Sequence, residues 1–173
     1  GEESSKGTAF HWLMEQWAFG TGRELDGDLI DEAMVRVGLV ETSPEYGDQR
    51  DILEALVENV RAEDELIERL ADAAERGDLF HELPVSWLDG ETGMHLRGDV
   101  DLVWRDADGK WHLLDYKAGT NYPTAGDDLS TSESVTKYYP QVDAYRRGLE
   151  AALDAEVESF GLWFVTGGVV LRW

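Results

Sequence analysis

Apolar residues recur at helical spacing through the first half of the chain. From Thr8 to about Phe19 they fall three and four positions apart, as on one face of an α-helix. Three more amphipathic helices are predicted to follow. We expect a second helix capped by Asp28, a third at about residues 48–62, and a fourth that begins at Asp64 and ends at Gly77.

Apolar residues in the second half follow the spacing of strands, with one long helix among them. We predict strands at residues 79–88, 94–104, 111–119, 157–165 and 169–173, and a helix at about residues 134–153. We therefore expect a single domain over residues 1–173, of the α/β (α+β) class, with a mixed central β-sheet flanked by helices. The helices at about residues 24–77 are expected to be an insertion, and without them the order is α-β-β-β-α-β.

A carboxylate and an ammonium group stand together near the end of the third predicted strand. Side chains alternate faces along a strand, so Asp115 and Lys117 share one face. Burying either charge alone would be costly. The pair is therefore either an ion pair that closes the strand or part of a metal site, with a carboxylate ligand beside a lysine that handles a water or a phosphate oxygen.

The preceding strand favours the metal site. Asp99 and Asp101 share one face of that strand, and an antiparallel hairpin through the polar turn at residues 105–110 can place Asp101 across from Asp115. Two carboxylates that lie so close repel each other unless a cation lies between them. Oxygen ligands of this kind suit a hard divalent ion, Mg²⁺ or Mn²⁺.

Five short motifs resemble those of the PD-(D/E)xK nuclease superfamily, in particular its RecB/AddA-type nuclease domains. The central two are Gly98-Asp99-Val100-Asp101-Leu102 and Leu114-Asp115-Tyr116-Lys117-Ala118-Gly119. The other three are Gly7-Thr8-Ala9-Phe10-His11, Glu82-Leu83-Pro84-Val85 and Gln141-Val142-Asp143-Ala144-Tyr145. Each motif is short, but all five occur in the family's order between positions 7 and 145. The resemblance implies a restriction-endonuclease-like core.

The resemblance also implies a catalytic site. Asp101, Asp115 and Lys117 are expected to be catalytic, and His11, Asp101, Asp115 and the Tyr116 backbone carbonyl to hold Mg²⁺ or Mn²⁺. A lone histidine on a helix is more often semi-buried and hydrogen-bonded, and the accompanying motifs favour a metal ligand at His11 instead.

Glu82 has two possible roles, and the three remaining histidines have no predicted role in the site. Glu82 is expected either to contact the metal through a water or to be an ordinary strand-end charge. The three remaining histidines follow no ligand spacing, and we expect His81, His95 and His112 on the surface.

The long helix near the C-terminus carries the expected DNA contacts. The resemblance implies that Gln141 and Tyr145 bind DNA, and core packing is the alternative for Tyr145, which shares its face with Leu149. The densest basic cluster of the chain lies on the same helix and comprises Lys137, Arg146 and Arg147.

The overall charge argues against nucleic-acid binding, unless the acidity is an adaptation to a solvent of high salt concentration. The chain has 37 acidic and 15 basic residues, a net charge of −22, whereas nucleic-acid binders are usually basic. The acids are spread over every predicted helix, and lysine occurs only four times. This dispersed acidity resembles that of proteins from extreme halophiles, in which salt screens the repulsion. A protein that never touches DNA is the rival interpretation.

Several sequence features that the chain lacks limit the kind of protein that we expect. The chain has no cysteine, which rules out disulfides and the four-cysteine iron–sulfur cluster of some relatives and favours the cluster-free RecB/AddA branch. It has no apolar run of membrane-spanning length, no signal peptide and no phosphate-binding loop of an ATPase, so we expect a cytoplasmic protein without a motor of its own. Residues 1–6 are expected to be a frayed lead-in, and the abrupt start suggests a piece of a longer polypeptide.

These observations predict a metal-dependent DNA nuclease. The resemblance implies the nuclease domain of a RecB/AddA-like helicase–nuclease, which acts in DNA end processing and recombinational repair beside a helicase motor. A degenerate nuclease domain that only binds DNA or serves as a scaffold is the alternative. A glycosidase with paired carboxylates would not need Lys117.

The loop at residues 120–132 follows the catalytic strand and is expected to move over the site.

Overall fold

The structure, a computed structural model, describes residues 5–119 and 122–173. Its helices are α1 (Ser5–Trp17), α2 (Gly27–Arg36), α3 (Tyr46–Arg61), α4 (Asp64–Glu75) and α5 (Glu133–Leu153), with short 3-10 helices η1 (Ala18–Gly20) and η2 (Leu129–Thr131). Its strands are β1 (Leu79–Leu88), β2 (His95–Arg105), β3 (Trp111–Lys117), β4 (Val157–Phe164) and β5 (Val169–Arg172). Residues 1–4 of the predicted lead-in, and residues 120 and 121 of the predicted loop, lie outside the described residues.

The five strands form one mixed sheet in the order β1-β2-β3-β4-β5. Neighbouring strands are antiparallel except for β3 and β4, which are parallel and are joined through α5. Helices flank the sheet, which confirms the predicted fold class and is consistent with the restriction-endonuclease-like core that the resemblance implies.

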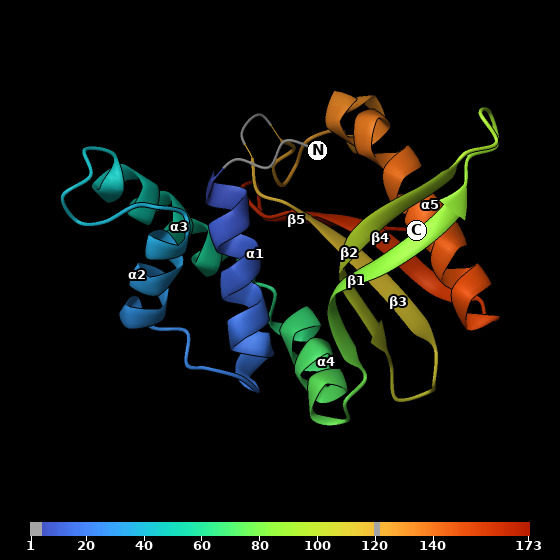
Figure 1. Ribbon diagram of the computed structural model, residues 1–173, viewed down its shortest axis with the longest axis horizontal. Helices are drawn as coiled ribbons and strands as arrows, with labels where there is room; N and C mark the ends of the chain where they lie inside the picture. Colours follow the sequence, from blue (N-terminus) through green and yellow to red (C-terminus); the bar gives the residue numbers. More distant parts are fainter. Residues whose placement is uncertain (1–4, 120–121) are drawn as a thin grey trace.

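The sheet lies between two helical layers (Figure 1). Helices α1–α4 lie on one side, where α4 contacts β1 and β2 and α2 packs on α1 and α3, and α5 packs against the other face; each side has its own hydrophobic cluster. Strand alternation produces this division: Leu114 of β3 packs in the cluster of α1–α4, and its neighbour Leu113 packs with Val142 of α5. A site on β3 therefore presents Asp115 and Lys117 on the α5 side, the side of Leu113.

The first strand changes faces at Glu82. Its φ of 51° is a left-handed conformation that is rare for a residue with a Cβ atom. Before this point His81 stacks on Phe19 at 6.2 Å, on the side of α1. After it Val85 and Trp87 pack in the α5 cluster, so the outer part of the β1–β2 hairpin crosses to α5.

The predicted start of the second helix was two residues late. Asp26, not Asp28, is the N-cap: its side chain accepts a hydrogen bond from the Leu29 backbone N–H at 2.9 Å, and α2 begins at Gly27. Asp28 lies in the first turn, where its charge faces the positive end of the helix. Because aspartate suits both positions, the sequence alone does not separate them.

The predicted surface position is right for His95 and wrong for His112. His112 is buried, with Nδ1 2.6 Å from the Ser159 Oγ and Nε2 2.7 Å from the Asp106 Oδ2. His81 is half-buried. The partners of His112 lie in the β2–β3 turn and on β4, so no spacing within its own strand could indicate them.

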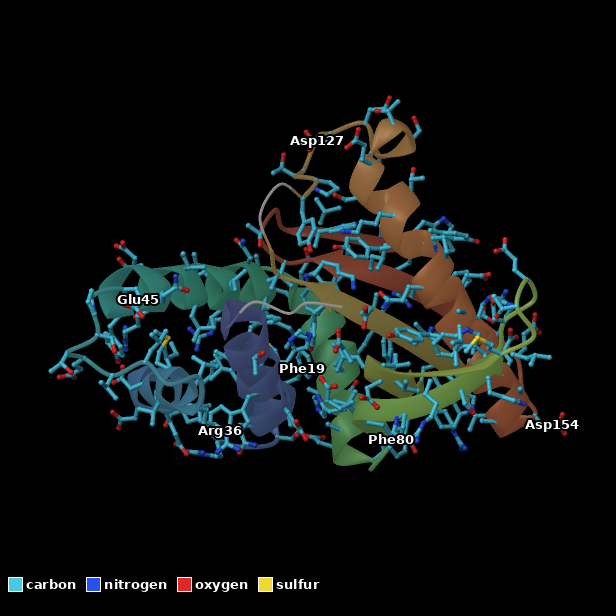
Figure 2. The ribbon with its side chains drawn as sticks, turned by 45° about the horizontal axis from the view of Figure 1, so that its top comes forward. Phe19, Arg36, Glu45, Phe80, Asp127 and Asp154 are labelled. Carbon is cyan, nitrogen blue, oxygen red and sulfur yellow. The ribbon has the colours of Figure 1, made fainter. Side chains whose placement is uncertain are left out.

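Acidic side chains are dispersed over the described surface. Figure 2 shows Glu45, Asp127 and Asp154 at widely separated points of its outline. Among the described residues, no helix combines the length and apolar character that crossing a membrane would require.

Candidate active site

The centre of the site is the point at which β2 and β3 separate. Their pairing ends at Leu102 opposite Leu114, and the next residues outward are Asp101 and Asp115. Both are buried, with 6% and 5% of their surface exposed. The Tyr116 backbone N–H donates to the Asp101 Oδ2 at 2.7 Å, so a carboxylate takes the place of a ladder carbonyl. The strand ends thus bring together the two acids that the alternation pattern paired.

Because Asp101 and Asp115 are buried beside each other, ionisation of both carboxyl groups is unfavourable. Burial raises the pKa of Asp101 well above its usual range, and the neighbouring Asp115 carboxylate raises it further, while His11 opposes the shift. A proton or a cation must therefore compensate the pair.

His11 and Glu82 lie next to Asp101 and form with it a group of possible metal ligands. Helix α1 is anchored by buried Phe10 and Leu13, and it places the His11 Nε2 3.1 Å from the Asp101 Oδ1. The left-handed residue Glu82 lies across from Asp101 in the β1–β2 hairpin. One donor atom from each of His11, Glu82 and Asp101 lies within 4.8 Å of the others. Glu82 is thus part of the acidic cluster, and Asp115 adjoins this group through Asp101.

The donor set fits a divalent cation. It offers one imidazole nitrogen and several carboxylate oxygens, a mixture that suits Mn²⁺ and Mg²⁺. The charges of Asp101, Glu82 and Asp115 also act on buried Tyr116, whose pKa is raised mainly by burial and further by these carboxylates. The electrostatic strain of the cluster is of the kind that a bound cation relieves.

Lys117 is fixed by three contacts on the α5 side of the sheet. Its Nζ lies 3.0 Å from the Asp115 Oδ2 and donates to the Gln141 Oε1 at 3.0 Å. The same atom lies 4.2 Å from the centre of the Tyr138 ring. Gln141, which the resemblance assigns to DNA, therefore has a partner inside the protein.

Tyr145 is packed inside the protein. Only 6% of its surface is exposed, and its ring meets Trp87 edge-on at 5.6 Å. A Cβ atom on Gly98 would lie 2.6 Å from the Tyr145 ring, so the glycine makes room for the tyrosine. Burial supports the core-packing alternative for Tyr145.

The basic cluster expected on α5 is largely neutralised. Arg146 pairs with Asp143 at 2.7 Å and with Glu150 at 2.5 Å, and Arg147 pairs with Asp143 at 3.5 Å. Lys137 is exposed, and among the described residues it forms no ion pair.

Sequence reasoning missed the contact between Tyr122 and Tyr138 beside Lys117. The hydroxyls of Tyr122 and Tyr138 lie 3.2 Å apart, and Tyr122 also packs on Phe164. Helical spacing places Tyr138 one turn before Gln141 on the same face, among the side chains expected to face DNA, but it does not indicate that the ring contacts Lys117. Tyr122 lies in a loop, where no periodic pattern indicates a contact.

Comparison with known proteins gives one result for the family. The model of the PD-(D/E)XK nuclease superfamily matches residues 1–168, which include every helix and strand except β5 and all of the site residues. No curated protein matches the chain.

Proposed function

The chain belongs to the PD-(D/E)XK nuclease superfamily, and from this we propose that it is a DNA nuclease that hydrolyses phosphodiester bonds with Mg²⁺ or Mn²⁺. One observation carries the proposal: two buried carboxylates, Asp101 and Asp115, adjoin each other with a histidine on one side and a lysine on the other. An ion pair that merely closes a strand would need neither His11 nor the second acid.

The proposed roles follow from these positions. Asp101, Asp115, His11 and the Tyr116 carbonyl would hold the metal, and Glu82 would add a further carboxylate beside them. When bound, a divalent ion supplies positive charge to the scissile phosphate and acidifies water. Lys117 orients the attacking water or neutralises charge that develops on the phosphate. Gln141 keeps the lysine ammonium in place.

We propose a RecB/AddA-type helicase–nuclease as the wider setting. The five motifs in family order and the absence of cysteine support this branch. In that setting a helicase motor delivers DNA ends to the nuclease for recombinational repair in the cytoplasm. The dispersed acidity supports an origin in a halophile. A degenerate module that only binds DNA is disfavoured, because all the acids and the lysine of the motifs are present.

Two substitutions separate metal binding from catalysis. Asp115→Ala removes a ligand and should abolish both Mn²⁺ binding and DNA cleavage. Lys117→Ala should retain Mn²⁺ binding, because it removes a positive charge beside the cation, and should slow cleavage by about 10²–10³-fold. Calorimetric Mn²⁺ titration and cleavage of labelled DNA measure the two effects, with folding monitored by circular dichroism.

Matched controls remove the same charges elsewhere. Asp72→Ala on the exposed side of α4 and Lys110→Ala at the β2–β3 turn should leave both properties near the wild-type values. Cleavage by Lys117→Ala at the wild-type rate would reduce the Asp115–Lys117 contact to a strand-end ion pair and would refute the proposed mechanism.

A further inference from the structure

Lys137 is an unusual cation in this protein. Of the lysines whose side chains the structure describes, Lys117 pairs with Asp115 at 3.0 Å and Lys110 with Glu158 at 3.7 Å. Lys137 has no such carboxylate partner within the described residues, although the chain carries 37 acids. It is exposed on the second turn of α5.

Lys137 and Lys117 converge on one aromatic ring. The Lys117 Nζ lies 4.2 Å and the Lys137 Nζ 5.0 Å from the centre of the Tyr138 ring. The face of a tyrosine ring attracts cations and so holds together two ammonium groups that repel each other. The pKa of Tyr138 is lowered, first by the hydrogen bond with Tyr122 and then by the two lysines.

The acids of the loop before α5 form no ion pair with Lys137 among the described residues. Asp127 and Asp128, in the loop before α5, accept hydrogen bonds from the loop's own backbone, from Thr124 N–H at 2.8 Å and Ser130 N–H at 3.1 Å. Figure 2 shows Asp127 at the outer tip of this loop. Lys117 has one carboxylate partner, Asp115, and Lys137 has none among the described residues, so the two ammonium groups keep an excess positive charge that can bind an anion.

Resting on the proposed function, we propose that Lys137 and Tyr138 form a phosphate-binding ledge for the DNA substrate. Lys137 contacts a backbone phosphate next to the one that is cleaved. Tyr138 is a positioning residue, whose ring orients Lys117 toward Asp115 and the scissile phosphate. The ledge lets DNA approach an acidic protein through a local contact, and it takes over the role that ion-paired Arg146 and Arg147 do not fill.

The Lys137 contact is tested by the salt dependence of DNA binding. Fluorescence anisotropy of a labelled single-stranded oligonucleotide gives Kd over a range of KCl concentrations. Lys137→Gln should weaken binding and reduce the slope of log Kd against log [KCl] by about 0.7, the value for one lost phosphate contact on a single strand. Lys110→Gln removes the same charge at the opposite end of the sheet from the tyrosines and should leave the slope unchanged.

The positioning role of Tyr138 is tested by steady-state cleavage. Tyr138→Leu removes the ring and should lower kcat by about tenfold, whereas Tyr138→Phe keeps the ring face and should recover most of that loss. Lys137→Gln should raise KM with little change in kcat, because its contact is equal in the ground state and the transition state. Thermal unfolding of each variant reports its folding.

The outcomes distinguish this inference from the proposed function. If the wild type cleaves DNA but Lys137→Gln retains the wild-type salt slope, the ledge is wrong and the nuclease stands. Failure of Tyr138→Phe to recover kcat would overturn the positioning role in the same way. If the wild type neither binds nor cleaves DNA with either metal, the proposed function is wrong and the ledge with it.

Discussion

At the scale of single residues, Gln141 binds Lys117 inside the protein, whereas its position on the helix predicted a contact with DNA. Its Oε1 accepts a hydrogen bond from Lys117 at 3.0 Å, so the amide is engaged before any substrate arrives. A hydrogen bond to a charged group contributes more than a neutral one. Gln141 therefore influences the reaction through the orientation of the lysine, and any contact with DNA would be in addition.

Replacement of Gln141 tests this role. Gln141→Ala should lower kcat by about tenfold, equivalent to about 1.4 kcal/mol, because the lysine loses one of its fixed contacts. Mn²⁺ affinity and the thermal midpoint should stay near the wild-type values, since the amide forms no hydrogen bond with the acids proposed to hold the metal. Gln49→Ala on α3 is the control, and a collapse of Mn²⁺ binding in Gln141→Ala would make Gln141 part of the metal site instead.

A contact of a single residue could be predicted from the sequence only where strand or helix periodicity relates the two partners. Alternation along two strands placed Asp101 beside Asp115, because that inference needs only a period of two and an antiparallel turn. Glu82 was left open because no pattern indicates a left-handed glutamate in a strand. The ring of Tyr138 was missed as a cation-binding face because Lys117 and Lys137 belong to different elements.

At the scale of elements, the β1–β2 hairpin and α5 approach each other through two glycines. Gly98 faces the ring of Tyr145, and a Cβ atom on Gly148 would lie 2.7 Å from the Ser86 backbone carbonyl. This close approach fixes how the hairpin lies across α5, and hence where Asp101 and Glu82 stand relative to Lys117. The strand and helix bounds were largely predictable from periodicity, but this contact joins residues far apart in sequence.

A methyl group at Gly148 should therefore separate the hairpin from the helix. Gly148→Ala is expected to destabilise the protein by about 1–3 kcal/mol, because a backbone carbonyl must move to admit the new atom. Gly47→Ala in α3 is the matched control, since no atom lies within 4 Å of its Cβ position and alanine favours a helix. Urea unfolding of both variants measures the difference, and equal stabilities would contradict the close packing described here.

At the scale of the whole molecule, the net charge of −22 is the dominant property. The acids cover separate regions of the described surface, and the arginines of α5 are occupied by ion pairs. Self-repulsion of this kind weakens a folded state in dilute buffer and is screened by salt. Composition predicts the property directly, whereas the local phosphate ledge needed the three-dimensional positions of two lysines.

The stability of the domain should therefore increase with salt. We expect the thermal midpoint to rise between low and molar KCl, by about 2–4 °C for each kcal/mol of repulsion that is screened. Scanning calorimetry over a KCl series measures this rise. A midpoint that is constant or falls with KCl would refute adaptation to salt and leave the acidity without that explanation.

We propose above all that this chain hydrolyses DNA with a divalent metal held by Asp101 and Asp115 beside Lys117. The most direct test of this claim is cleavage of end-labelled single- and double-stranded DNA by the wild-type protein at high KCl, with Mg²⁺, with Mn²⁺ and with a chelator. We predict cleavage that requires the metal and is lost in Asp115→Ala. Intact DNA with both metals and both substrates, from a protein shown to be folded, would contradict the claim.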